Sequence, residues 1–217
     1  MKVFLFDLDG TLLNSLEDIA LACNTVLRRH GLPEHPLPAY RQMVGRGFDY
    51  LVRSALPAAT LDRTSPEALR ALVDEARAWY GGHMCEHTRP YDGLDAALQS
   101  LCDQGRVLAV LSNKPDELTK DLVRRYFPAV PFALVRGARD DAPLKPDPAV
   151  PRAMLAALNV PAADACYVGD SDVDVFTAHN AGMTAVGAGW GFRGAAELEA
   201  AGAEHVLAAP CRLPDLP

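Results

Sequence analysis

The stretch FLFDLDGTLLNS, residues 4–15, decides the fold prediction for this chain. Its apolar start, together with Val3, has the length of a buried strand, and it ends at two carboxylates, Asp7 and Asp9. Alternate residues of a strand share one face, so both side chains can face the same crevice. Two like charges there are costly unless a cation or a proton neutralises them. A surface turn, in which Asp-Gly is a common dipeptide, is the alternative interpretation.

Apolar runs of strand length recur along the chain, and most are nearly continuous, as in strands that are covered on both faces. They lie at 3–7, 107–113, 132–137, 165–170 and 183–189, with a weaker one at 205–208. Helical patterns separate them, at 92–105, 116–127, 148–160 and 171–182. This alternation predicts an α/β fold, a Rossmann-like parallel sheet with helices on both faces. We expect a strand order near 3-2-1-4-5 with the first strand central.

One interval, residues 15–88, breaks this alternation because it contains no convincing strand. Helical patterns replace it, at 15–31, 39–56 and 66–82. We therefore expect a small α-helical domain, residues 15–89, inserted into a core domain made of residues 1–14 and 90–217. Ser15 and Asp18 resemble a capping box at the start of the first helix. The Ala-rich tail, 195–209, is compatible with a helix.

Composition narrows the possible partners. The chain has 217 residues and a net charge of −7, which disfavours nucleic acids and anionic membranes as partners. Its five cysteines are widely spaced and form no CxxC pair, which favours reduced thiols and a cytoplasmic protein. No signal peptide and no apolar run of about 18 residues or more is found, so we expect no membrane span.

A second acidic group follows the run at 165–170, in the sequence YVGDSDVD. Asp170 stands where that strand should end, so it can face the same crevice as Asp7. Asp174 lies one helical turn further on, whereas Asp172 is expected to be a solvated charge of the helix start. Oxygens from Asp7, Asp9 and Asp170, completed by water and a substrate phosphate, suit Mg²⁺.

Two further strand ends offer groups that a phosphate needs. In LSNKP, the Ser112 hydroxyl and the backbone N–H groups at a helix start can cradle an anion, although an ordinary helix cap is an equal alternative. In LKPDP, Lys145 stands between Leu144 and Pro146. At the mouth of a carboxylate crevice, this lysine can balance the charge of a transferring phosphoryl group.

The segments DLDGT, SN, K and GDSDVD, in this order, resemble the haloacid dehalogenase superfamily of phosphohydrolases across essentially the whole chain. The stretches RPYDGL, SNKP, KPDP and WGFRG are most similar to its phosphoglycolate phosphatase branch. The resemblance implies that the inserted helical domain is a cap over the active site. Asn14 departs from this branch, which often has Asp there, and Pro151 lies one position later than expected.

The resemblance also implies roles for single residues. Asp7 would be the nucleophile that forms an aspartyl-phosphate, and Asp9 the general acid and base. The carboxylates of Asp7 and Asp170 and the backbone carbonyl of Asp9 would hold Mg²⁺. Thr11, Ser112 and Asn113 would form hydrogen bonds around the phosphoryl group. Lys145 would neutralise charge, and Asp174 would orient Lys145 or metal-bound water.

Three other stretches contain groups that could bind a substrate, a metal or a dinucleotide. In MVGRGFDYL, Gly45 and Gly47 flank Arg46 and let its guanidinium reach a substrate anion, unless this is a plain helix connection. HMCEH offers His83, Cys85 and His87 to a metal, but it lacks a fourth ligand and is expected to be structural. GAGWGFRG mimics a dinucleotide-binding fingerprint, but no acidic residue follows at the right distance, so a loop beside the site is expected.

These observations predict a Mg²⁺-dependent phosphatase that hydrolyses a small phosphate monoester such as phosphoglycolate. A phosphomutase or a pyrophosphatase on the same scaffold is the alternative, and the presence of Asp7, Asp9, Lys145 and Asp170 disfavours a non-catalytic binding protein. We expect a small phosphorylated metabolite as partner and either a monomer or a homodimer.

Overall fold

The chain folds as two units in a computed structural model that describes residues 1–217. The core unit consists of Met1–Asn14 and Pro90–Pro217, and the helical unit consists of Ser15–Arg89. None of the helices combines the length and the apolar character that crossing a bilayer requires.

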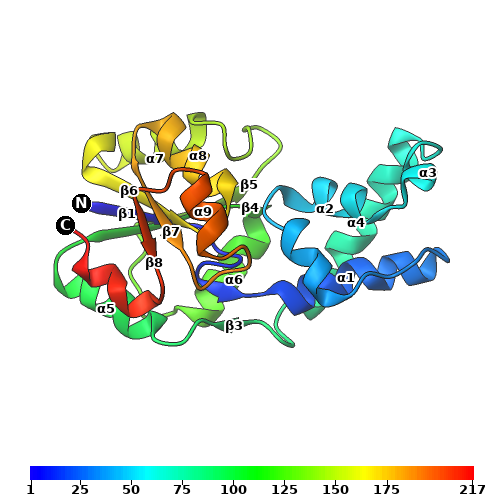
Figure 1. Cartoon of the computed structure of the whole chain (residues 1–217), viewed down its shortest axis with the longest axis horizontal. Helices are drawn as coiled ribbons and strands as arrows, with labels where there is room; N and C mark the ends of the chain where they lie inside the picture. The colour runs from blue at the N-terminus through cyan, green and yellow to red at the C-terminus, as the bar shows by residue number, and fades with distance from the viewer. The chain divides into compact units, whose positions relative to one another are not determined.

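A six-stranded parallel sheet forms the centre of the core unit (Figure 1). Its order is β5-β4-β1-β6-β7-β8, so the prediction of a central first strand in a 3-2-1-4-5 arrangement is confirmed, and the weak run at 205–208 supplies the sixth strand. The strands are β1 Val3–Phe6, β4 Val107–Pro115, β5 Leu134–Ala138, β6 Ala165–Gly169, β7 Thr184–Ala188 and β8 His205–Leu207. In register, Phe6 lies between Val110 and Val168, so β1 and β6 end within a residue of each other, whereas β4 continues to Pro115.

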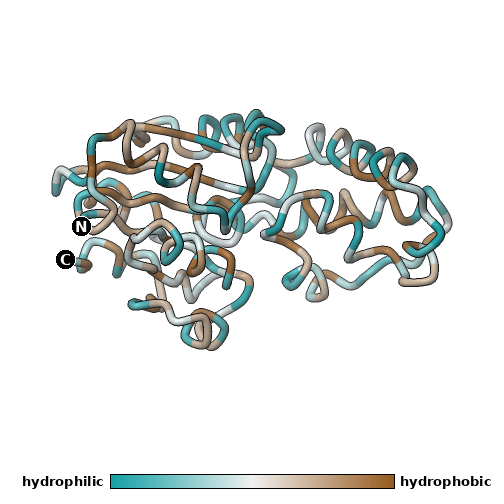
Figure 2. The backbone as a smooth tube through the Cα atoms, turned by 90° about the horizontal axis from the view of Figure 1, so that it is seen from above, coloured by the Kyte–Doolittle hydropathy of each residue, from teal (hydrophilic) through white to brown (hydrophobic).

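Helices cover both faces of this sheet, as predicted from its apolar strands. Figure 1 shows α7 (Ala149–Ala157) and α8 (Asp172–Ala181) on one side and α5 (Leu94–Asp103) on the other. The first face packs Val3, Leu5 and Tyr167 against Met154 of α7 and Val175 of α8. The remaining elements of the core unit are α6 Asp116–Tyr126, α9 Ala195–Ala200 and two 3₁₀ helices, Ala162–Asp164 and Pro210–Asp215. Figure 2 shows long hydrophobic stretches of the backbone in the core unit.

The helical unit has an apolar interior of its own. Phe48 and Tyr80 lie at its centre, with ring centroids 5.5 Å apart, and both are buried. Its helices are α1 Leu16–Arg29, a 3₁₀ helix Leu37–Gln42, α2 Gly47–Ala55, α3 Ala58–Leu61 and α4 Pro66–His83. Two two-residue strands, β2 Leu13–Asn14 and β3 Arg89–Pro90, form a separate small sheet.

Two expected helices are shorter than their patterns. The pattern at 39–56 breaks because Gly45 and Gly47 adopt φ values of 114° and 87°, which a helix cannot contain. The Ala-rich tail is helical only to Ala200, and the chain then turns at Gly202, with φ 91°, and enters β8. Hydrogen bonding along the edge of β7 outweighs the helix propensity of the alanines.

The expected capping box at Ser15 and Asp18 is wrong. The Ser15 side chain makes no cap hydrogen bond. The buried Asp18 carboxylate instead accepts hydrogen bonds from the backbone N–H groups of His87 and Thr88 and from the Thr88 hydroxyl, at 2.9, 2.9 and 2.7 Å. Asp18 therefore ties the end of the helical unit to its first helix, a long-range role that local sequence does not indicate.

Candidate active site

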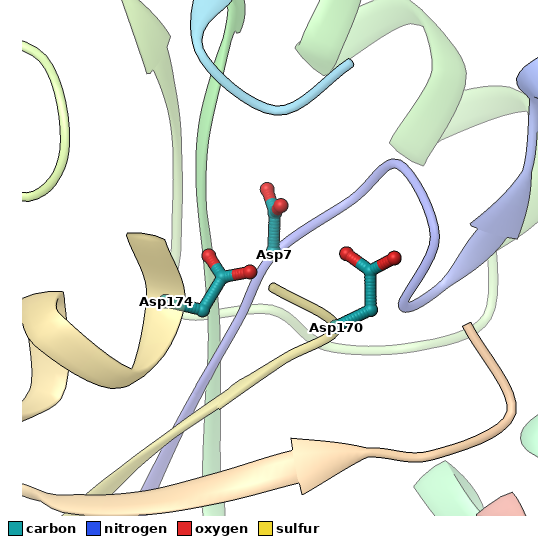
Figure 3. Close-up of side chains that lie close together, drawn as sticks. All are labelled: Asp7, Asp170 and Asp174. Atoms are coloured by element: carbon teal, nitrogen blue, oxygen red, sulfur yellow. The ribbon is translucent and has the colours of Figure 1, made fainter. Parts of the chain in front are cut away.

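Three carboxylates gather at the carboxyl edge of the sheet. Asp7 follows β1, Asp170 follows β6, and Asp174 lies in the first turn of α8. Figure 3 shows the three side chains around one space, and one oxygen of each lies within 4.8 Å of the others. All three are buried. Buried oxygens at this spacing form a group that can hold a divalent cation.

Lys145 joins two of these carboxylates. Its ammonium lies 3.0 Å from Asp7 Oδ1 and 2.7 Å from Asp174 Oδ1, and its side chain is 1% exposed. The backbone of Lys145 is held in turn by the Asn113 side chain, which accepts from its N–H at 2.8 Å and donates to its carbonyl at 3.2 Å. The Asp174 carboxylate is further fixed by the Ser171 hydroxyl at 2.7 Å. The lysine is therefore placed by side chains from two separate strand ends.

The site also contains a lysine that the sequence analysis missed. Lys114 is buried, and its ammonium lies 2.8 Å from Asp9 Oδ1. The Asp9 carboxylate thus pairs with the Lys114 ammonium. The group of three carboxylates that could hold a metal ion consists of Asp7, Asp170 and Asp174, and it does not include the Asp9 carboxylate. The only sequence signal was that LSNKP follows an apolar strand directly, so that Lys114 stands close to a sheet edge.

Asp170 is clamped by the loop that resembles a dinucleotide fingerprint. The Phe192 N–H donates to Asp170 Oδ2 at 2.7 Å, and the Trp190 indole donates to the Thr11 carbonyl at 3.0 Å. A Cβ on Gly191 would lie 2.3 Å from the Cβ of Asp170 and 2.4 Å from the Gly10 carbonyl oxygen. The glycine therefore permits a backbone approach that no larger residue allows.

The predicted phosphate-binding residues line the same edge. Thr11 and Ser112 are buried, and no hydrogen bond is directed at the Thr11 hydroxyl oxygen. The Ser112 hydroxyl accepts from the Lys114 N–H at 3.3 Å. A buried hydroxyl without a partner is costly, so Thr11 is suited to meet a ligand.

Burial dominates the electrostatics of the site. It raises the pKa of Asp7 to about 6, with Lys145 opposing and Asp174 and Asp9 reinforcing the shift. Burial and the Asp174 and Asp7 charges likewise raise the pKa of Asp170, against the Phe192 N–H. Burial alone would lower the pKa of Lys145, but Asp174 and Asp7 outweigh it and raise that pKa well above its ordinary value.

The buried charges of the core unit do not balance. Its buried carboxylates are Asp7, Asp9, Asp170 and Asp174, and its buried ammonium groups are Lys114 and Lys145. With every group ionised, four negative charges would face two positive ones, and burial opposes that state by raising the pKa of Asp7 and Asp170. A divalent cation would compensate this formal surplus of two negative charges.

Other predicted residues lie in the helical unit. Arg46 precedes α2, and its guanidinium lies over the Tyr50 ring, 5.5 Å from the ring centroid. The His83 ring stacks on Trp79, with centroids 3.9 Å apart, and bonds its carbonyl at 2.8 Å. His87 lies 3.5 Å from Glu17. These histidine contacts are structural, in line with the sequence interpretation.

Comparison with known proteins gives consistent matches. A family model described as haloacid dehalogenase-like hydrolase matches residues 4–188. A phosphoglycolate phosphatase from Mannheimia succiniciproducens is 32% identical over 199 residues, which cover 88% of this chain and 87% of the relative. One from Pseudomonas syringae pv. tomato is 36% identical over 194 residues, 88% of this chain and 70% of the relative.

Solved structures share the fold over nearly the whole chain. A predicted phosphoglycolate phosphatase from Haemophilus somnus superposes with a TM-score of 0.88 at 25% identity, covering 99% of this chain and 97% of the other. A predicted phosphatase from Clostridium acetobutylicum gives a TM-score of 0.86 at 27% identity, covering 99% and 96% of the two chains.

Proposed function

Because the chain belongs to the haloacid dehalogenase-like hydrolase family, we propose that it is a Mg²⁺-dependent phosphatase acting on a small phosphate monoester. Phosphoglycolate is the first substrate proposed, since relatives that cover most of the chain carry that activity in their names. The helical unit is proposed as the cap, with Arg46 as a contact for the substrate's anionic group. The five free cysteines support a reducing, cytoplasmic setting.

The observation that carries the proposal is the state of Asp7 Oδ1. This atom is buried, and the Lys145 ammonium lies 3.0 Å from it and compensates its charge. A desolvated carboxylate whose charge is compensated by a lysine can act as a nucleophile toward phosphorus. Asp7 is therefore the proposed nucleophile.

The metal-binding proposal rests on the same residues. Mg²⁺ takes oxygen ligands, and the carboxylates of Asp7 and Asp170 with the backbone carbonyl of Asp9 are the proposed set. Asp174 is the proposed orienting residue, because its two oxygens are already engaged by Lys145 and Ser171. Bound Mg²⁺ would neutralise charge on the phosphoryl oxygens as a Lewis acid. A divalent ion would also compensate the formal surplus of two negative charges that arises when all four buried carboxylates are ionised.

The proposed reaction has two steps. An Asp7 oxygen bonds to phosphorus while the bond from phosphorus to the substrate oxygen breaks, and the leaving oxygen keeps the electron pair and takes a proton from Asp9. A water molecule then gives a proton to Asp9 as its oxygen bonds to phosphorus. The bond between phosphorus and Asp7 breaks, and its electron pair returns to the carboxylate. Lys145, Thr11 and Ser112, with Asn113 holding Lys145, are proposed to compensate and bind the phosphoryl oxygens.

The substitution Asp7→Asn tests the proposal. We expect phosphate release from phosphoglycolate to fall by at least about 10⁴-fold, because no carboxylate remains to form the covalent intermediate. Acid quenching during turnover should trap phosphate on the wild-type chain and none on the variant. Asp172→Asn, in the acidic stretch after β6 but outside the acidic group, is the matched control and should keep its activity.

Two results would overturn the proposal. One is substantial turnover by Asp7→Asn. The other is a wild-type chain that releases no phosphate from any member of a panel of phosphate monoesters with Mg²⁺ present. The same panel separates the alternatives, since a phosphomutase isomerises a sugar phosphate without releasing phosphate, and a pyrophosphatase prefers pyrophosphate.

A further inference from the structure

The buried pair of Lys114 and Asp9 carries an inference about the first step of the reaction, in which the leaving oxygen takes a proton. The Lys114 side chain is 1% exposed and that of Asp9 is 10% exposed, with 2.8 Å between the ammonium and Oδ1. We propose that Lys114 is a positioning residue, which holds the Asp9 carboxyl at the place where the leaving oxygen departs. This inference rests on the proposed function, because it assigns the support of its general acid.

The backbone of Lys114 is fixed on both sides. Its N–H donates to Ser112 Oγ at 3.3 Å, and its carbonyl accepts from Thr119 Oγ1 of α6 at 3.1 Å. On the neighbouring strand, a Cβ on Gly137 would lie 2.5 Å from the Lys114 carbonyl oxygen, so β5 approaches this point as closely as a glycine allows. Pro115 restricts Lys114 to an extended conformation. The backbone from which the Lys114 side chain extends is therefore held in place.

The two buried lysines divide the reactive carboxylates between them. Lys145 contacts Asp7 and Asp174, whereas Lys114 contacts Asp9. Exposed pairs such as Lys2 and Asp164, at 71% and 40% exposure, contribute little restraint, because water screens them. In the buried pair the attraction is stronger, and separating the partners would leave both charges uncompensated. Lys114 therefore restrains the side chain of Asp9 as an exposed lysine cannot.

Leaving-group chemistry gives this role a specific signature. An alkyl phosphate releases a basic alkoxide that needs a proton, whereas p-nitrophenyl phosphate releases a stable phenolate that does not. A residue that positions the general acid should therefore matter for the first substrate and little for the second. A residue that merely supports the fold should affect both equally.

The experiment compares Lys114→Met with the wild-type chain on both substrates, with kcat and KM measured separately. The alkyl substrate is phosphoglycolate, or the alkyl phosphate of the panel that the wild type hydrolyses fastest. We expect the rate of aspartyl-phosphate formation, followed in a single turnover, to fall on the order of 10²-fold for the alkyl phosphate and less than about tenfold for p-nitrophenyl phosphate, with KM unchanged. Hydrolysis of the aspartyl-phosphate is common to both substrates, so it does not enter this comparison. Lys2→Met, which removes an exposed lysine, is the matched control and should change neither.

A double variant that combines Lys114→Met with Asp9→Asn completes the test. It also keeps the test possible if Lys114→Met alone does not fold. Asp9→Asn should show the same dependence on the leaving group, and Lys114→Met should add nothing to it, because both residues serve one proton transfer. The neutral pair in the double variant avoids a buried unpaired carboxylate if Lys114→Met alone fails to fold.

Three results would overturn the inference. Equal loss of the rate of aspartyl-phosphate formation on both substrates would mean a structural role for Lys114. A higher KM with kcat intact would make it a substrate contact. A further loss of more than about tenfold on adding Lys114→Met to Asp9→Asn would make the two residues independent. An inactive wild type would instead overturn the phosphatase proposal itself, and this inference with it.

Discussion

Lys145 shows at the scale of one residue how burial sets the chemistry of this protein. Its ammonium lies between the Asp7 and Asp174 carboxylates, and all three side chains are at most 5% exposed. In such surroundings a charge is tolerated only with its partners. The contacts of Lys145 with Asp7, the proposed nucleophile, and with Asp174 therefore also bear on the stability of the fold.

The substitution Lys145→Met should be strongly destabilising for that reason. It leaves two buried carboxylates facing one another, and we expect the free energy of unfolding to fall by about 3–5 kcal/mol in urea titrations at pH 7 without Mg²⁺. Adding Asp174→Asn should recover part of the loss by removing one charge. A change below about 1 kcal/mol for Lys145→Met would show that water or protons compensate these carboxylates.

At the scale of elements, loops and helix pairs position groups that lie far apart in the sequence. The loop after β7 reaches back to the first motif, where Phe192 bonds Asp170 and Trp190 bonds the Thr11 carbonyl. In the helical unit, Glu75 of α4 bonds Arg29 at 2.9 Å and His30 at 2.8 Å, at the end of α1. Each contact can be tested by one substitution.

Gly191→Ala should weaken metal binding. Its methyl group would collide with Asp170 and with the Gly10 carbonyl, so the loop must move and release the Asp170 carboxylate. We expect Mg²⁺ affinity, measured by calorimetry, to fall by about 10–100-fold. Gly82→Ala, whose Cβ meets nothing within 4 Å, is the matched control. Unchanged affinity in Gly191→Ala would mean that the clamp has no part in metal binding.

Glu75 gives a prediction about pH. Hydrogen bonds from His30 and Arg29 lower the pKa of the Glu75 carboxyl, so the folded state binds its proton less tightly than the unfolded state does. The contacts of Glu75 with Arg29 and His30 therefore contribute stability above pH about 4.3. This contribution is lost as the pH falls through the lowered pKa of the Glu75 carboxyl.

The substitution Glu75→Gln should accordingly lower the free energy of unfolding by about 0.5–1 kcal/mol at pH 7. The difference from the wild type should vanish at low pH, where both side chains are uncharged. Glu199→Gln, at an exposed position of α9, is the control and should show no such pH-dependent difference. A Glu75→Gln difference that persists at low pH would point to packing rather than charge.

At the scale of the whole molecule, the active-site charges affect the stability of the chain. With its four buried carboxylates ionised, the site has a surplus of two negative charges, which are part of the chain's net charge of −7. A cation that binds only the folded state relieves this surplus and stabilises the fold by mass action.

Saturating Mg²⁺ should therefore raise the melting temperature by about 5–10 °C, which corresponds to about 2.7 kcal/mol at one hundred times the Kd for a chain of this size. Sodium chloride at equal ionic strength controls for screening. Asp170→Asn should abolish the shift, and Asp172→Asn should keep it. An equal shift with sodium would mean that Mg²⁺ acts on the surface charge alone.

The prediction from sequence succeeded where the signal was local and periodic. The apolar runs gave the strands, and their alternation with helices gave the strand order, since right-handed crossovers leave few arrangements. Asp7 and Asp170 were found because carboxylates directly after buried strands must meet at one sheet edge. Lys114 was missed because nothing in its local sequence indicates its partner, Asp9, which lies far away in the chain.

The chain's own pattern determined a parallel α/β sheet with a helical insertion and the edge at which its acidic motifs meet, because these follow from the periodicity of apolar residues and the direction of parallel strands. Only the tertiary structure decided which charge pairs with which. Lys114 faces Asp9, Lys145 faces Asp7 and Asp174, and Asp18 leaves its expected cap for Thr88. Such pairings depend on distances of a few ångströms between segments far apart in the chain, and the cost of burying a charge, rather than any local propensity, selects them.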